Sequence, residues 1–233
     1  MNTGSIDAGI RRVARVDLSV ISACIARAWE RSPDGVLDAR ADAYGHGLRE
    51  VVAMAVDAGV PTIRVTPAEA ERAGTRRSRL MTVASASRPL IADAAYGVDH
   101  ESRDAALTLT GEVVAVKPTE AGAGVSYGYT YRTPRDTTLA LVALGYADGL
   151  PRLASNRAFV TIEAQRVPIV GRVAMDQFVV DCGDLAPEVG ADAVIFGSAS
   201  ASAPTAAEWG EWTERPPLDL TAGIGARVRR SYS

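Results

Sequence analysis

The chain has 233 residues, a formal net charge of −3 and 47% hydrophobic residues. This length and apolar content suit one large domain or two small ones with a buried core. A charge so near neutral argues against a nucleic-acid or membrane-surface partner, and no apolar run is long enough to cross a bilayer. The N-terminus lacks the pattern of a signal peptide, and two cysteines do not make a disulfide framework, so we expect a cytoplasmic protein.

The first half of the chain alternates strand-like and helix-like segments. A short strand is expected before Asp17, which is placed to cap a helix whose apolar residues recur at helical spacing up to Trp29. Further strands are predicted at 36–41, 62–65 and 79–83, and further helices at 48–58 and 67–74. Strands that alternate with helices at this spacing predict parallel βαβ units.

The second half has a different period. Short strand-like runs separated by turn residues occupy 112–116, 139–144, 158–162, 167–170, 177–181 and 193–196. Such a pattern predicts a compact, mainly antiparallel β domain. We therefore expect an α/β domain over residues 1–108 and a β domain over residues 109–233.

Several motifs resemble one known family. The run 41–47 reads Ala-Asp-Ala-Tyr-Gly-His-Gly and follows the strand expected at 36–41. It is similar to the signature of the alanine racemases, which are pyridoxal-phosphate (PLP) enzymes of the barrel type. Motifs similar to those of the family's C-terminal domain follow in the same order at 124–128, 145–149, 168–172 and 175–177.

The resemblance implies a fold and a truncation. It implies a partial (β/α) TIM-type barrel in residues 1–108 and an alanine-racemase-like β domain in residues 109–233. Residues 88–97 look like the family's last barrel strand, yet a full barrel needs roughly 200 residues or more. The middle strands of the barrel are therefore expected to be missing.

The resemblance also implies roles for individual residues. In the family, the residue before the first motif is the lysine that holds PLP as a Schiff base, and here it is Arg40. The second catalytic base corresponds to Tyr127, which would reach the site of a partner subunit. Tyr44 would lie beside the cofactor phosphate and Arg88 would face the pyridine nitrogen, both vestigial if PLP is absent. Met175 would meet the substrate carboxylate through its backbone.

The substitution at Arg40 decides what chemistry we expect. A guanidinium stays protonated and is a poor nucleophile, so it cannot form a Schiff base. Lys117 is the single lysine of the chain and falls in a strand of the β domain, where the resemblance places no cofactor lysine. We therefore expect no cofactor, no metal and no PLP-dependent racemisation.

Three functions remain open. The first is an enzyme of racemase ancestry that uses Tyr127 and Arg40 for acid/base chemistry on a small carboxylated or carbonyl substrate, with Asp176 and His46 as further substrate-binding residues. For His46, a structural role in orienting the turn is the alternative. The second function is a non-catalytic pseudoenzyme or regulatory binding module. The third is a genuine alanine racemase that uses Lys117 or free PLP.

A homodimer is expected for all three. A partial barrel leaves unpaired strand edges, which proteins usually cover, and the family builds each site from two chains. The β domain of one copy should face the Arg40 turn of the other. The ligand is expected to be a small molecule.

Overall fold

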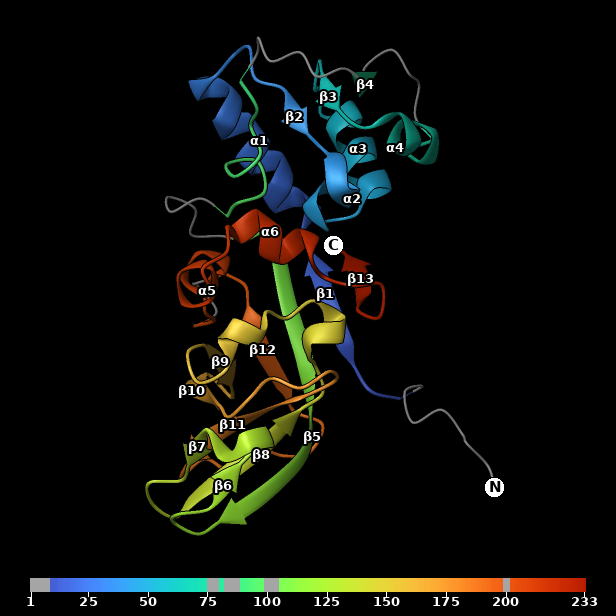
Figure 1. Cartoon of the computed structure of the whole chain (residues 1–233). Helices are drawn as coiled ribbons and strands as arrows, with labels where there is room; N and C mark the ends of the chain where they lie inside the picture. Colours follow the sequence, from blue (N-terminus) through green and yellow to red (C-terminus); the bar gives the residue numbers. More distant parts are fainter. Residues whose placement is uncertain (1–8, 75–79, 82–88, 99–104, 199–201) are drawn as a thin grey trace, which may run out of the picture.

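A computed structural model describes residues 9–74, 80–81, 89–98, 105–198 and 202–233 of the chain. An α/β part lies at one end of an elongated molecule and a β domain at the other (Figure 1). The helices are α1 (Leu18–Arg31), α2 (Arg40–Tyr44), α3 (Leu48–Asp57), α4 (Pro67–Arg72), η3 (Tyr127–Tyr129), η4 (Tyr146–Asp148), η5 (Arg152–Ala154), α5 (Ala206–Thr213) and α6 (Pro217–Ala222). The strands are β1 (Arg12–Val16), β2 (Leu37–Asp38), β3 (Ile63–Arg64), β4 (Leu80–Met81), β5 (Leu107–Thr119), β6 (Gly124–Val125), β7 (Tyr131–Arg132), β8 (Thr137–Val142), β9 (Phe159–Ile162), β10 (Gln165–Val170), β11 (Phe178–Gly183), β12 (Asp192–Phe196) and β13 (Arg229–Tyr232).

The α/β part contains a small parallel sheet. Its strand order is β2-β3-β4, and Val36 adds a parallel bridge to Leu90 beside β2. Helix α1 begins where the sequence predicts, because the Asp17 carboxylate accepts hydrogen bonds from the first free backbone amides of the helix. The predicted parallel pairing is present, while the assignment of this part to a truncated barrel stays a prediction.

The β domain is a closed barrel. Strands β12, β9, β10, β11, β8 and β5 pair in that order, and a further pairing between β12 and β5 closes the ring. All of these pairings are antiparallel. The mainly antiparallel β domain predicted from the sequence is therefore confirmed.

The N-terminal strand joins the two parts. β1 does not pair with β2; it pairs with β5 in antiparallel and with β13 in parallel register. It can do so because β5 is 13 residues long: its residues 107–111 pair with β1, whereas β8 pairs with its residues 113–119. The expected domain boundary at residue 108 stays a prediction. Strand β1 lies before this boundary in the sequence, yet it pairs within the same sheet as the strands of the β domain.

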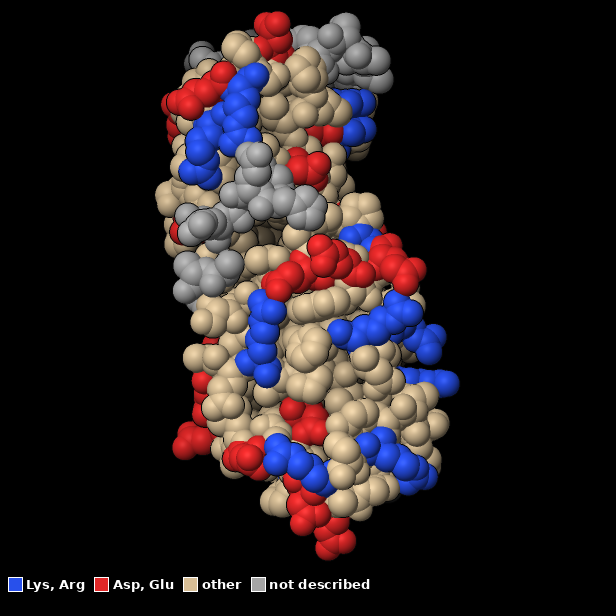
Figure 2. All heavy atoms as spheres, turned by 90° about the vertical axis from the view of Figure 1, so that its left-hand side faces the viewer, with Lys and Arg blue, Asp and Glu red and all other residues tan. Residues whose placement is uncertain are grey.

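One apolar core runs through both parts. It includes Leu37 and Ile63 of the parallel sheet, Leu109 at the junction, and Phe178 and Trp209 of the β domain. None of the helices in the described ranges is both long and apolar enough to span a membrane. Figure 2 shows the side of the molecule that lies on the left in Figure 1, where acidic and basic side chains are interspersed over both parts.

Candidate active site

The turn that begins at Arg40 has an unusual backbone. Its helix α2 follows directly after β2, and four successive non-glycine residues from Ala41 to Tyr44 have φ between 50° and 58°. A left-handed conformation costs roughly 1–2 kcal/mol per L-residue. The surrounding structure stabilises it: Asp42 accepts a hydrogen bond from the Leu48 amide at 3.0 Å, and the buried Glu69 carboxylate accepts one from the Asp42 amide at 3.4 Å. Strain that is held in this way is typical of functional turns.

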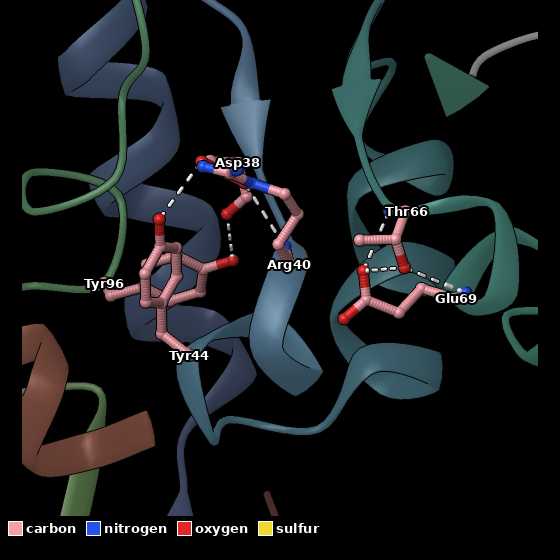
Figure 3. Close-up of polar contacts among 6 residues, drawn as sticks. All are labelled: Asp38, Arg40, Tyr44, Thr66, Glu69 and Tyr96. Atoms are coloured by element: carbon pink, nitrogen blue, oxygen red, sulfur yellow. Dashed lines mark hydrogen bonds and ion pairs between the residues drawn. The ribbon is translucent and has the colours of Figure 1, made fainter. Parts of the chain in front are cut away.

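A polar cluster occupies the start of this turn (Figure 3). The Asp38 side chain is fully buried at the end of β2, and its carboxylate accepts hydrogen bonds from Arg40 Nε at 2.8 Å and Arg40 Nη2 at 2.6 Å. The Tyr44 hydroxyl donates to the same carboxylate at 3.0 Å. Behind it, the buried Tyr96 hydroxyl donates to the Asp38 carbonyl oxygen at 2.8 Å. Arg40 and Tyr44 thus share one buried carboxylate.

The protonation states of this cluster follow from its contacts. Burial alone would raise the pKa of Asp38, but the hydrogen bonds and charge of Arg40 outweigh burial, so the pKa of Asp38 lies below its usual value. Burial, followed by the charge of Asp38, raises the pKa of Tyr44. The hydrogen bond to Asp38 raises the pKa of Arg40. The cluster is therefore an anion held between a permanent cation and a neutral hydroxyl.

His46 lies inside the protein. It has no exposed surface, its ring stacks on Tyr96 with centroids 4.6 Å apart, and its Nδ1 lies 3.0 Å from the Ala43 carbonyl oxygen. A carbonyl can only accept, so Nδ1 carries the proton and donates. Burial lowers the pKa of His46 to about 4. With no exposed surface, His46 is placed to orient the turn, and its expected role in substrate binding stays a prediction.

Tyr127 stands on a rigid turn of the β domain. It begins η3, between the two strands of the β6–β7 hairpin, and 72% of its surface is exposed. Ser126 holds a φ of 59°, and its hydroxyl donates to the Arg172 carbonyl oxygen at 2.8 Å. Within the described residues, no hydrogen bond of the Tyr127 hydroxyl is found. The side chain is thus presented to the outside from a fixed backbone.

A cavity opens beside this tyrosine. It has a volume of about 320 Å³ and is lined by Ser126, Tyr127, Tyr129, Leu141, Arg172, Ala174, Gln177, Phe178 and Val179. A neighbouring groove of about 230 Å³ shares Ser126, Leu141 and Val179 with it and is also lined by Lys117. The single lysine of the chain therefore lies on the β domain, near the Tyr127 turn.

The loop that carries Met175 and Asp176 is fixed at its backbone. The Met175 carbonyl accepts a hydrogen bond from the Ala147 amide at 2.9 Å, while 52% of the surface of Met175 is exposed. Asp176 accepts a hydrogen bond from Arg227 Nη1 at 2.5 Å. The expected substrate role of Asp176 stays a prediction, and in this structure its carboxylate is already paired.

The two expected catalytic residues are not brought together in one chain. Arg40 begins α2 in the α/β part, whereas Tyr127 lies between β6 and β7 at the opposite end of the molecule (Figure 1). Arg88 lies outside the described residues. A site containing both Arg40 and Tyr127 would need one of them from a second chain.

Comparison with known proteins identifies the family. The family described as "Alanine racemase, C-terminal domain" matches residues 106–232, which is more than half of the chain. The chain belongs to this family. Alanine racemases from Streptomyces coelicolor and Salinispora arenicola are 46% and 49% identical over 126 and 128 residues, which is 54% of this chain in each case. These matches cover 32% and 34% of the relatives, so the chain spans about a third of their length.

Solved structures of alanine racemases share the fold. The enzyme from Streptomyces lavendulae has a TM-score of 0.87 at 22% identity, with 97% of this chain and 98% of that chain covered. The enzyme from Bartonella henselae, described with covalently bound pyridoxal phosphate, has a TM-score of 0.79 at 19% identity, with 96% and 99% covered. At these identities the likeness shows the fold alone.

The expectation of no cofactor is wrong. The similar proteins are alanine racemases, and one of them carries PLP in a covalent bond, so the family points to PLP and not to a scaffold without a cofactor. Position 40 of this chain does not fit such a bond: Arg40 offers no amine, and two of its nitrogens are bound to Asp38. The Tyr44 hydroxyl, expected beside a phosphate, is also bound to Asp38.

Sequence reasoning missed Asp38 and Tyr96. The sequence predicts a strand before Arg40 and assigns Asp38 no role, although an acid within a buried strand needs a partner. An arginine two residues later was the available signal for that partner. Tyr96 gave no local signal, because its contact with Asp38 joins residues 58 positions apart.

Proposed function

We propose that the chain is an isomerase-type enzyme that transfers protons at a carbon of a small carboxylated substrate of the amino-acid class. Tyr127 is the acid/base residue, and two copies of the chain build each site together. The substrate class is taken from the alanine racemases that the β domain resembles at 46–49% identity.

The observation that carries the proposal is the exposed Tyr127. A tyrosine with 72% of its surface exposed, on a strained turn next to a cavity of about 320 Å³, is costly to keep without a use. Its hydroxyl can give or take a proton from a ligand in that cavity. Arg172 lines the same cavity and supplies a cation for a substrate carboxylate.

The Arg40 turn of a second copy is proposed as the opposite wall of the site. In this turn the Nε and Nη2 atoms of Arg40 are bound to Asp38, which leaves Nη1 to meet a ligand. Arg40 can therefore offer a ligand carboxylate one contact, from Nη1, and not a bidentate one. Arg40 acts as a fixed cation and not as a base.

The test follows proton exchange at the substrate. Purified protein is incubated with L-alanine in deuterium oxide, with and without added PLP, and loss of the α-proton signal is followed by NMR. Tyr127→Phe removes only the hydroxyl and should slow exchange about 100-fold or more. Tyr146→Phe is the matched control and should keep the native rate, because Tyr146 is 45% exposed and does not line this cavity.

A second function is favoured by the closed Asp38–Arg40 contact. A turn whose charged groups satisfy one another suits a non-catalytic binding or regulatory module. No exchange by the native protein, with or without PLP, would replace the enzyme proposal with this one. Equal exchange by native protein and Tyr127→Phe would remove Tyr127 from the mechanism.

A further inference from the structure

Asp38 and Arg40 are matched to each other. An ionised carboxylate with no exposed surface is strongly destabilising unless opposite charge and hydrogen bonds meet it. Arg40 provides both, through Nε and Nη2, at 2.8 Å and 2.6 Å. Neither residue suits this turn without the other.

The burial of the pair is unequal. The Asp38 side chain is fully buried, whereas 37% of the Arg40 side chain is exposed. Tyr44 and Tyr96 pack against each other beside the pair, with ring centroids 5.7 Å apart, and both hydroxyls donate to oxygens of Asp38. Asp38 is therefore the fixed member, to which any side chain at position 40 must adapt.

We propose that Asp38 is a second barrier, besides the missing amine of Arg40, to covalent attachment of an aldehyde cofactor at the Arg40 turn. Restoring a lysine at position 40 is not enough, because the buried Asp38 carboxylate holds that lysine as an ammonium ion. The proposal concerns this covalent bond only, and it does not depend on whether the chain transfers protons.

The chemistry of imine formation gives the reason. The lone pair of an uncharged amine attacks the aldehyde carbon of PLP, and the resulting carbinolamine loses water to leave a C=N bond. An ammonium ion has no lone pair to attack with. An opposite charge in contact at a buried site favours the charged form of an amine. Two substitutions, at positions 38 and 40, are therefore needed before an imine can form at this turn.

The experiment measures the covalent product directly. All variants carry Lys117→Arg, so that position 40 holds the single ε-amine of the chain. Arg40→Lys alone is compared with Arg40→Lys combined with Asp38→Asn, which keeps the size of the side chain and an acceptor for Tyr44. Each protein is incubated with PLP at neutral pH and reduced with borohydride. Peptide mass mapping then gives the modified fraction at position 40.

The expected result is at least about tenfold more modification in the Asp38→Asn combination than in Arg40→Lys alone, which corresponds to one pKa unit of the amine. The matched control combines Arg40→Lys with Asp219→Asn. Asp219 pairs with Arg215 at an exposed position, so Asp219→Asn removes one negative charge away from the Arg40 turn. This control should leave the modified fraction at position 40 low. Asp38→Val with Arg40→Lys is a second buried neutral variant, in case the asparagine disturbs folding.

Two outcomes would overturn the proposal. One is an equal modified fraction at position 40 in Arg40→Lys and in Arg40→Lys combined with Asp38→Asn. The other is no modification at position 40 in any variant whose circular dichroism spectrum matches the native one. Because the readout is a mass at one residue, failure here is distinct from failure of the proton-exchange test.

Discussion

The backbone of Gly45 passes directly against that of Thr221. A Cβ placed on Gly45 would lie 2.0 Å from the Thr221 carbonyl oxygen, and Gly45 has a φ of +82°. This contact seats the Arg40 turn on helix α6, so the turn is held by the C-terminal part of the chain. Arg230 strengthens the junction by donating to the Gly45 carbonyl oxygen at 3.3 Å.

Gly45→Ala should therefore be strongly destabilising. The added methyl group meets backbone that cannot rotate away, and the positive φ is strained for alanine, so we expect a loss of about 2–5 kcal/mol in the free energy of unfolding. Urea denaturation measures this loss. Gly59→Ala is the control, since Gly59 has a φ of +84° but no atom within 4 Å of its added Cβ. It should cost about 1 kcal/mol, and equal losses for both variants would contradict the close packing.

His46 should make stability depend on pH. Its pKa is about 4 in the folded protein, because it is buried, and about 6.5 when unfolded. Between these values the unfolded state binds the extra proton, so stability falls as the pH drops from 6.5 to 4. At about 1.4 kcal/mol per pKa unit, the loss reaches about 3 kcal/mol.

The measurement for His46 is urea unfolding at several pH values. His46→Phe keeps an aromatic ring against Tyr96 but cannot titrate, so its stability should change less over the same range. Asp38 and Glu69 also have pKa values below their usual ones, and their contributions are lost below about pH 4.5, outside most of this window. Parallel curves for the native and His46→Phe proteins would assign the dependence to other groups.

Asp148 ties the N-terminal strand to the C-terminal segment. Its buried carboxylate accepts a hydrogen bond from the Gly145 amide at 2.8 Å and lies 3.6 Å from Arg12 Nε and 3.4 Å from Arg227 Nε. Asp148→Asn removes a carboxylate that Arg12 and Arg227 share, while Arg12 keeps its hydrogen bond to the Ala143 carbonyl oxygen and Arg227 keeps Asp176, so it should cost about 1–3 kcal/mol. Asp219→Asn, which breaks an exposed pair, should cost less than about 1 kcal/mol. Thermal unfolding of the two variants separates these outcomes.

The sequence predicts regular elements well where they are locally determined. Asp17 and the apolar spacing behind it place α1, which runs from Leu18 to Arg31. The strand runs of the second half all correspond to strands of the barrel. In these segments the hydrophobic period and the caps are local signals, so no knowledge of distant contacts is needed.

The Arg40 turn could not be predicted in the same way. Alanines at positions 41 and 43 favour a right-handed helix, yet both are left-handed because Glu69, Thr221 and other distant groups surround the turn. The strands that pair with β1 were also not predictable from local pattern, because the sequence of a five-residue strand does not determine which sheet edge it pairs with. Long-range contacts decide both features.

The Tyr127 face should be the dimer interface. Tyr127 and Tyr129 line the cavity and are exposed, and the exposed Met175 follows Ala174, which lines the same cavity. Large exposed side chains of this kind are typical of protein interfaces. Met175→Glu would bury an unpaired carboxylate in the interface, so dissociation should be at least about tenfold easier. Sedimentation velocity over a dilution series measures it. Val189→Glu is the control, because Val189 has 63% of its surface exposed and does not line the Tyr127 cavity. A native chain that sediments as a monomer at all concentrations, or equal weakening by both variants, would contradict this interface.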